Sequence, residues 1–306
     1  MTRELRLAVG YTCNLACPYC YAVYRSASDR AVNPEVLTAD DYGELVRATT
    51  GLNKVSITGG EPFVDALWPK TRTIIQACDE RAVPVRISTN GLFLTETVCR
   101  VLSDYTHGTQ LVVQVSLDGA TAPTHDQSRR APGAFEQIVR GIQTARRYGI
   151  PIQVRYTLTR HNWQETGQCV KLCHGLDVSS LVIKPLLEFR DGTAAVDPQV
   201  ELHALHRQLD DWRQHYPGVQ VRLADWNVQR PTTCACGQTS VHVTPNGDVY
   251  ACGYQAGVVP QPQWRLGNIR QPNWMQVVEQ SAELTAFGDI YAVSQCPGAW
   301  IGEKEA

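Results

Sequence analysis

Three cysteines stand close together near the amino terminus, in the stretch Cys13-Asn14-Leu15-Ala16-Cys17-Pro18-Tyr19-Cys20. They follow a short and mostly apolar run, Leu5 to Val9. Three thiolates on one loop can hold three corners of a cubane iron–sulfur cluster, which leaves the fourth iron without a protein ligand. That iron is open to a small chelating molecule. A zinc site fits less well, because zinc prefers four closed ligands and no fourth Cys or His lies nearby.

A second group of cysteines lies toward the carboxyl terminus and consists of Cys234, Cys236, Cys252 and Cys296. Within this group, Ser240–Thr244 and Val249–Ala251 flank the turn Pro245-Asn246-Gly247-Asp248, which predicts a β-hairpin. A zinc ribbon is an alternative here, since tetrahedral sites of four cysteines are common on hairpins.

Composition limits the class of protein. The chain has 306 residues, of which 43% are hydrophobic, and a net charge of −2. This length suggests one large domain and one small domain, which we expect at residues 1–218 and 219–306. The charge gives no strong field for nucleic acid or anionic membrane, and no apolar run approaches the roughly 20 residues of a membrane span. Eleven cysteines without a signal peptide predict a cytoplasmic protein with metal or redox chemistry.

The elements that must position these cysteines alternate along most of the chain. We expect strands at Leu5–Val9, Lys54–Thr58, Val83–Ile87, Leu111–Ser116, Ile152–Leu158 and Ser180–Pro185, with helical patterns between them. Six β/α units in a row predict a parallel sheet with helical crossovers. Ligands of such a sheet gather at the carboxyl ends of the strands. Polar residues and glycines follow several of these ends.

The C-x3-C-x2-C loop, with Gly59-Gly60-Glu61-Pro62 following thirty-nine residues after it, resembles the radical S-adenosylmethionine (SAM) superfamily. The resemblance implies an α/β fold, an open partial (β/α)6 barrel. It also implies a [4Fe–4S] cluster bound by Cys13, Cys17 and Cys20, with SAM on the open iron. Such enzymes generate a 5′-deoxyadenosyl radical that abstracts hydrogen from a substrate C–H bond.

The resemblance also implies residues that bind SAM. Gly59, Gly60 and Glu61 match the motif that holds its amino group. Short polar residues at the next strand ends match the positions facing its carboxylate and ribose; they are Ser88, Asn90, Ser116 and Asp118. Tyr19 matches an aromatic that packs near the adenine, and the backbone at Ile183 matches an adenine contact. Asn-Gly and Asp-Gly are also strong turn formers, so turn chemistry is an alternative for the polar residues.

The C-terminal hairpin, with a helix near Trp274–Ser281, resembles the SPASM/twitch extension of these enzymes in its short twitch form. That extension holds an auxiliary [4Fe–4S] cluster near the substrate. Cys236, Cys252 and Cys296 match twitch ligands. Cys234 is then the fourth ligand, or the cluster keeps an open or non-cysteine site. In the second case Cys234 is a free thiol beside the active site.

Short twitch enzymes of this build include sugar-alcohol dehydrogenases and amino-sugar epimerases. We expect an epimerase acting on a carbohydrate or aminoglycoside-type natural product, in which Cys234 or Cys252 returns the hydrogen. The alternatives are a dehydrogenase, a maturase that cross-links or epimerises a ribosomal peptide, and a zinc-binding adaptor. Expected partners are a small-molecule or peptide substrate and an electron donor such as flavodoxin or ferredoxin. Arg155, Lys184 and Glu188 could touch a polar substrate, although each also suits a surface or helix-pairing role.

Overall fold

The computed structural model describes residues 3–20, 31, 34–106, 110–186, 203–223, 239–253, 256 and 265–280. The strands are β1 (Arg3–Ala8), β2 (Leu52–Thr58), β3 (Val85–Thr89), β4 (Leu111–Ser116), β5 (Ile152–Leu158), β6 (Ser180–Pro185), β7 (Gln220–Leu223), β8 (Ser240–Val243), β9 (Asp248–Tyr250) and β10 (Arg265–Asn268). The helices are α2 (Ala39–Ala48), α3 (Trp68–Glu80), α4 (Glu96–Ser103), α5 (Ala122–Arg129), α6 (Ala134–Arg147), the 3-10 turn η1 (Trp163–Glu165), α7 (Thr166–Gly175), α8 (His203–His215) and α9 (Trp274–Glu279).

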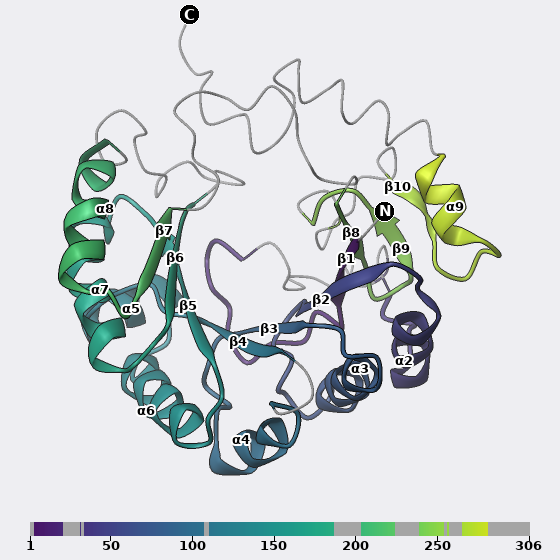
Figure 1. Ribbon diagram of the computed structural model, residues 1–306, viewed down its shortest axis with the longest axis horizontal. Helices are drawn as coiled ribbons and strands as arrows, with labels where there is room; N and C mark the ends of the chain where they lie inside the picture. The colour runs from purple at the N-terminus through teal and green to yellow at the C-terminus, as the bar shows by residue number, and fades with distance from the viewer. Residues whose placement is uncertain are drawn as a thin grey trace, which may run out of the picture.

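These strands form one curved sheet in the order β10-β9-β8-β1-β2-β3-β4-β5-β6-β7. Neighbours from β8 through β1 to β7 are parallel, whereas β9 is antiparallel to both β8 and β10. The sheet curls into an open barrel with the helices on its outer side (Figure 1). The α/β partial barrel expected from the sequence is confirmed, and β7 extends it by one parallel strand.

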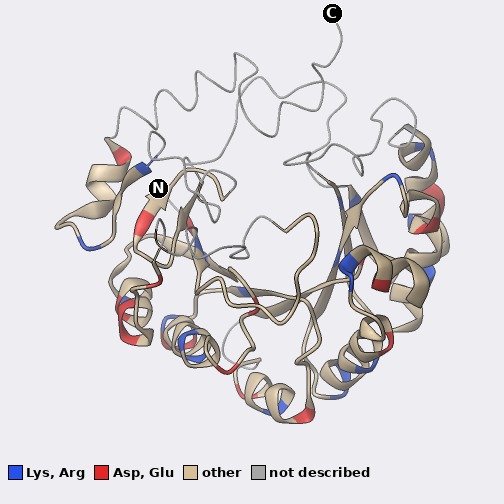
Figure 2. Cartoon of the chain, turned by 180° about the vertical axis from the view of Figure 1, so that it is seen from behind, with Lys and Arg blue, Asp and Glu red and all other residues tan. Residues whose placement is uncertain are grey.

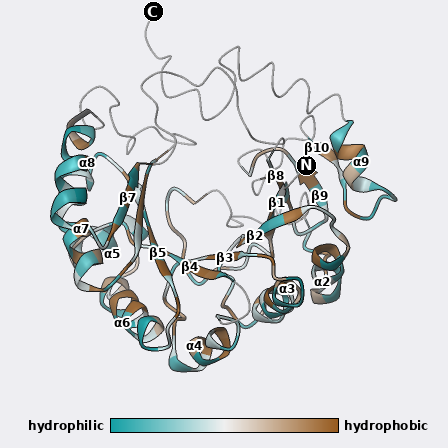
Figure 3. Ribbon diagram, in the orientation of Figure 1, coloured by the Kyte–Doolittle hydropathy of each residue, from teal (hydrophilic) through white to brown (hydrophobic). Residues whose placement is uncertain are grey.

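The two faces of the sheet differ in polarity because successive side chains of a strand point to opposite faces. The outer face carries Leu7, Ile57 and Ile87, which are fully buried in one core with Ile74 and Ile75 of α3. Figure 3 shows hydrophobic segments where the helices meet the strands. The inner, concave face instead carries polar residues such as Ser56, Arg86 and Gln114. Ser56 pairs with Arg86, and Gln114 pairs with Ser88, two residues further along β3.

Local sequence signals set the helix ends. A capping box at Thr38 starts α2: the Asp41 amide donates to Thr38 Oγ1 at 3.2 Å, and Asp41 Oδ2 accepts from the Thr38 amide at 2.7 Å. Thr95 caps α4 through the Val98 amide at 3.4 Å. None of the helices in the described part of the chain is long and apolar enough to span a membrane.

Helix α5 was absent from the sequence-based expectation. Its eight residues, Ala122–Arg129, bury only His125, so no apolar periodicity marks them. The available signal was Pro123 in the first helical turn after Thr121 at the N-cap position.

The C-terminal hairpin continues the barrel sheet, because β8 pairs with β1 in parallel, with Glu4 opposite Ser240 and Arg6 opposite His242. The Tyr11 hydroxyl, in the cysteine loop, also donates to the Ala256 carbonyl at 3.4 Å. β7, assigned from sequence to the second domain, pairs with β6 of the first. The division at residues 218 and 219 stays a prediction.

Candidate iron–sulfur and SAM site

The loop that carries the three N-terminal cysteines packs directly on the Gly59-Gly60 turn after β2. The Gly60 amide donates to the Gly10 carbonyl at 2.7 Å, and the Glu61 amide donates to the Thr12 carbonyl at 2.9 Å. A Cβ at Gly60 would lie 2.0 Å from the Thr12 oxygen, and one at Gly59 would lie 2.3 Å from the Gly10 oxygen. Gly59 also has φ +119°. Glycine is therefore required at both positions for the loop to approach.

The three cysteines lie in one electrostatic environment. Burial, with smaller contributions from Glu61, Cys17 and Cys20, raises the pKa of Cys13 to about 11, although the Leu15 amide opposes the shift. Cys17 is buried, whereas Cys13 and Cys20 are partly exposed. Within the described residues no three His, Cys, Asp or Glu side chains converge on a single ion. A cubane spreads its thiolates over different irons, so this loop fits a cluster.

Glu61 is almost completely buried, with 1% of its surface exposed. Its Oε1 accepts from Thr89 Oγ1 at 2.7 Å and from the Phe63 amide at 3.2 Å, and its Oε2 accepts from the Asn90 amide at 2.7 Å. Burial raises the pKa of Glu61 to about 7, although these three hydrogen bonds lower it. The carboxylate therefore joins the ends of β2 and β3. The SAM-binding role of Gly59, Gly60 and Glu61 stays a prediction.

Asn90, one of the predicted SAM residues, lies against the cysteine loop. Its Nδ2 donates to Asn14 Oδ1 at 2.8 Å and contacts Cys13 Sγ at 3.9 Å. Ser88 lies on the concave face and donates to Gln114 Oε1 at 3.3 Å. Ser116 is on the same face, where its register partner is Arg155. The structure thus brings Asn90 to the cysteine loop, while Ser88 and Ser116 face the barrel interior.

Asp118 has no exposed surface, and both of its carboxylate oxygens have protein partners. Oδ1 accepts from the Thr157 amide at 2.7 Å, and Oδ2 lies 2.5 Å from both the Tyr19 hydroxyl and Arg129 Nη2. Burial alone would raise the pKa of Asp118, but Arg129 and then Tyr19 hold it below its ordinary value. The SAM roles of Tyr19 and Asp118 stay predictions, and in this structure the two side chains bind each other.

Arg129 is the residue of this site that the sequence reading missed. It comes from α5, donates to Cys17 Sγ at 3.7 Å and stacks 5.5 Å from the Tyr19 ring centroid. His125, also from α5, accepts from the Asp118 amide at 3.0 Å through Nδ1. α5 therefore ties one cluster cysteine to the end of β4.

Ile183 lies in β6, and its side chain is fully buried in the core on the outer side of the sheet. The predicted adenine contact concerns its backbone and stays a prediction. Glu188 and three cysteines of the predicted auxiliary group, Cys234, Cys236 and Cys296, lie outside the described residues.

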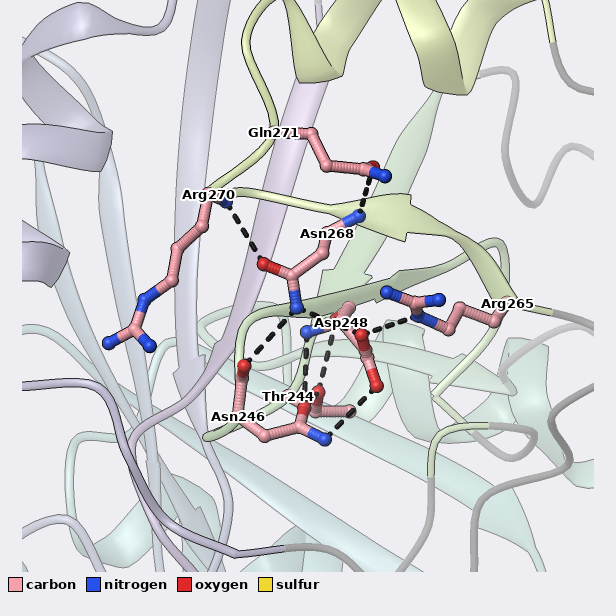
Figure 4. A network of polar contacts seen from close by, with 7 residues as sticks. All are labelled: Thr244, Asn246, Asp248, Arg265, Asn268, Arg270 and Gln271. Carbon is pink, nitrogen blue, oxygen red and sulfur yellow. Dashed lines mark hydrogen bonds and ion pairs between the residues drawn. The ribbon is translucent and has the colours of Figure 1, made fainter.

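Cys252, which is 8% exposed, follows a hairpin turn that a polar network holds in place (Figure 4). Asn246 Oδ1 accepts from the Asp248 amide at 3.1 Å, and Asp248 Oδ1 accepts from Asn268 Nδ2 at 2.9 Å and Arg265 Nε at 2.5 Å. Gly247 sits at the turn with φ +89°. The network fixes β8, β9 and β10 to one another, and it confirms the hairpin expected from the Pro-Asn-Gly-Asp sequence.

Comparison with known families agrees with this geometry. Residues 7–173, more than half of the chain, match the radical SAM superfamily, and residues 234–298 match SPASM, an iron-sulfur cluster-binding domain. The chain belongs to the radical SAM superfamily and has a C-terminal SPASM-type extension. Its cofactors are a SAM-binding [4Fe–4S] cluster, SAM and an auxiliary [4Fe–4S] cluster.

Several curated proteins are similar over most of the chain. It is 25% identical over 295 residues to the AdoMet-dependent heme synthase of Methanosarcina barkeri, covering 88% of this chain and 80% of that protein. It is 28% identical over 295 residues to the mycofactocin maturase MftC of Mycolicibacterium smegmatis, covering 90% and 69%. It is 23% identical over 299 residues to AlbA, the antilisterial bacteriocin subtilosin biosynthesis protein of Bacillus subtilis, covering 94% of this chain and 63% of AlbA.

Solved structures share the fold. Native anSMEcpe with bound AdoMet and the Kp18Cys peptide has a TM-score of 0.74 at 18% identity, covering 95% of this chain and 84% of that one. Streptococcus suis SuiB has a TM-score of 0.71 at 15% identity, covering 96% of this chain and 67% of that one.

Proposed function

We propose that this chain is a radical SAM maturase that modifies an unactivated C–H bond of a peptide. The observation that supports this most directly is the pair of family matches together with relatives named as maturases, MftC and an anaerobic sulfatase-maturating enzyme. Fold neighbours bound to peptides, anSMEcpe with Kp18Cys and SuiB with the precursor peptide SuiA, point the same way. None of these named proteins is a carbohydrate epimerase, so they do not support that expectation.

Within this proposal the chain's own residues have defined tasks. Cys13, Cys17 and Cys20 hold the cluster, and Asn90 and Arg129 donate to two of these sulfurs. When bound, the cluster and SAM supply the hydrogen-abstracting chemistry.

The buried groups around the loop keep it in one position. Glu61 fixes the ends of β2 and β3, and Asp118 fixes Tyr19 beside Cys20. The protein thereby supplies positioning and exclusion of water.

The C-terminal extension has a proposed task as well. Cys236, Cys252 and Cys296 are the proposed auxiliary ligands, and Cys234 is a fourth ligand or a hydrogen donor. The Tyr11 hydroxyl reaches the Ala256 carbonyl, four residues after Cys252, so this extension adjoins the N-terminal loop. The proposed electron donor is a flavodoxin or ferredoxin.

The test uses anaerobically reconstituted protein. We expect about eight irons per chain, two cubanes' worth. With SAM and dithionite we expect release of 5′-deoxyadenosine, and a mass change in a synthetic peptide encoded by a short reading frame beside the gene. An iron content of about four per chain would mean that the auxiliary cluster is absent.

Assays with sugar substrates test the epimerase and dehydrogenase alternatives to the peptide assignment. Reaction in deuterated water with deuterium gained at one inverted sugar carbon, and with no peptide modified, would restore the epimerase reading. Oxidised sugar would indicate the dehydrogenase. No 5′-deoxyadenosine with any substrate would contradict radical chemistry altogether. A Cys234→Ala variant separates the two roles of that cysteine, because lost iron marks a ligand and stalled turnover with full iron marks a donor.

A further inference from the structure

The concave face of the barrel has an unusual charge balance. Strands β1–β7 contain one acidic residue, Glu4, and the concave face carries Arg6, Lys54, Arg86, Arg155, Lys184 and Arg222. Strand register places them on one face: Arg86 pairs with Val112, Arg155 pairs with both Ser116 and Val182, and Val182 pairs with Arg222. Figure 2 shows blue segments along these strands.

Glu4 neutralises only part of this charge. Its carboxylate accepts from Ser56 Oγ at 2.5 Å and lies 3.3 Å from Arg6, 3.3 Å from Arg86 and 3.7 Å from Lys54. One carboxylate thus serves three cations. The geometry also shows that this face can gather several basic side chains around a single carboxylate.

Arg155 and Arg222 have no ion-pair partner within the described part of the chain. Strand β6 lies between their strands, and its residue Val182 pairs with Arg155 on one side and with Arg222 on the other. Parallel strands lie about 4.8 Å apart, so their backbones are about 10 Å apart and two long side chains can reach one ligand. A carboxylate suits this pair because a guanidinium binds it with two parallel hydrogen bonds.

Arg86 lies on the same face in β3, two strands from the strand of Arg155 and four from that of Arg222. Burial lowers the pKa of Arg86, and repulsion from Arg6, Arg155 and Arg222 adds to this despite the opposing effect of Glu4. The Nε of Arg86 is buried and has no hydrogen-bond partner among the described residues. A bound anion would relieve this repulsion and satisfy a buried donor.

We propose that Arg86, Arg155 and Arg222 bind the carboxylate of an acidic residue in the peptide substrate. This rests on the proposed maturase function and specifies the substrate class. The site lies on the interior face, below the strand ends that hold the cysteine loop. An anchored acidic residue would therefore direct a neighbouring residue of the peptide toward the carboxyl ends of the strands, where Cys13 and Asn90 lie.

Binding of matched peptides to the anaerobic holoprotein tests this. The probes are acetyl-Ala-Glu-Ala-amide and its Gln counterpart, followed by saturation-transfer NMR. We expect the Glu peptide to bind about tenfold more tightly than the Gln peptide, because a charge pair across an interface can contribute that much affinity. We expect the ratio to approach one in an Arg155→Gln/Arg222→Gln variant, and to fall at high salt. Arg72→Gln is the control, because it removes one charge from an exposed position on α3 and should keep the wild-type ratio.

Equal binding of both peptides to wild type would overturn the proposal, and so would an unchanged ratio in the double variant with a native circular dichroism spectrum. Glutarate binding as tightly as the Glu peptide would overturn the assignment to a peptide. Release of 5′-deoxyadenosine, measured on the same samples, separates the failures. If release persists without charge preference, only this inference fails; if release is absent, the proposed function fails.

Discussion

Arg129 lies 2.5 Å from Asp118, and its guanidinium is also 3.7 Å from the sulfur of Cys17. The Asp118 carboxylate is fully buried, so this ion pair links a cluster cysteine to a charge that water does not reach. Removing either partner leaves the other charge buried without compensation.

Arg129→Gln should therefore destabilise the fold by about 3–5 kcal/mol. Chemical denaturation of the reconstituted protein measures this loss. Arg140→Gln is the matched control, since its ion pair with Glu136 is about two-thirds exposed on both sides. That control should cost less than about 1 kcal/mol. Equal losses in the two variants would show that the Arg129 pair is not specially stabilising.

Arg129→Lys should lower the reduction potential of the N-terminal cluster. Lysine keeps the charge near Asp118 but loses the forked donor that contacts Cys17 Sγ, and hydrogen bonds to cluster sulfurs tune the potential. Potentiometric titration followed by electron paramagnetic resonance checks it. A reduction potential unchanged from wild type would mean that the contact between Arg129 and Cys17 Sγ does not tune the cluster.

Gly60→Ala should prevent assembly of the N-terminal cluster. A Cβ there would stand 2.0 Å from the Thr12 carbonyl oxygen, so the cysteine loop must move away from β2. We expect iron content to fall by about four per chain after reconstitution. Gly175→Ala, at the end of α7 with open space around the new Cβ, should retain full iron. Normal iron in the Gly60 variant would contradict the close approach.

Glu61→Gln should cost about 1–3 kcal/mol of stability. Glutamine has one acceptor oxygen, whereas Thr89, Phe63 and Asn90 direct three donors at two carboxylate oxygens. One amide hydrogen would then face the side-chain NH₂ group. Urea denaturation at neutral pH measures the loss, and Glu96→Gln on the exposed start of α4 serves as control. A loss no larger than the control's would mean that these donors do not need the second carboxylate oxygen.

His125 should make the protein less stable in mild acid. Burial lowers its pKa to about 4, against about 6.5 in the unfolded chain, although Asp118 opposes the shift. Below pH 6.5 the unfolded state takes up a proton that the folded state does not, so stability falls as pH drops toward 4. His125→Asn keeps an acceptor near the Asp118 amide and should remove about 1 kcal/mol of the stability difference between pH 7 and 5.5. An identical difference in both proteins would exclude this histidine as the cause.

The barrel and the cysteine loop were predictable because their signals are local. Most strands of the barrel are short segments rich in Val, Leu and Ile, and Gly59-Gly60-Glu61 follows one at a fixed spacing from the cysteines. The role of Arg129 was not predictable in the same way. It depends on a helix with little apolar periodicity and on a contact between residues 112 positions apart.

The partners of the Asp118 carboxylate could not be predicted from the sequence for a related reason. Asp-Gly reads as a turn, and no sequence rule states that Thr157, Tyr19 and Arg129 will all reach the same carboxylate. The basic concave face was visible only in part. Arg155 was noticed as a single residue, whereas its relation to Arg222 depends on strand register.

The pairing of β1 with both β2 and β8 bears on how the chain folds during synthesis. Strand β1 has one neighbour from residues 52–58 and the other from residues 240–243. Until that second neighbour is made, β1 presents an open edge, the kind that pairs with other chains. Closing a contact across so long a stretch is slow, so the chain is exposed to aggregation at this edge until residues 240–243 have been made and have paired with β1.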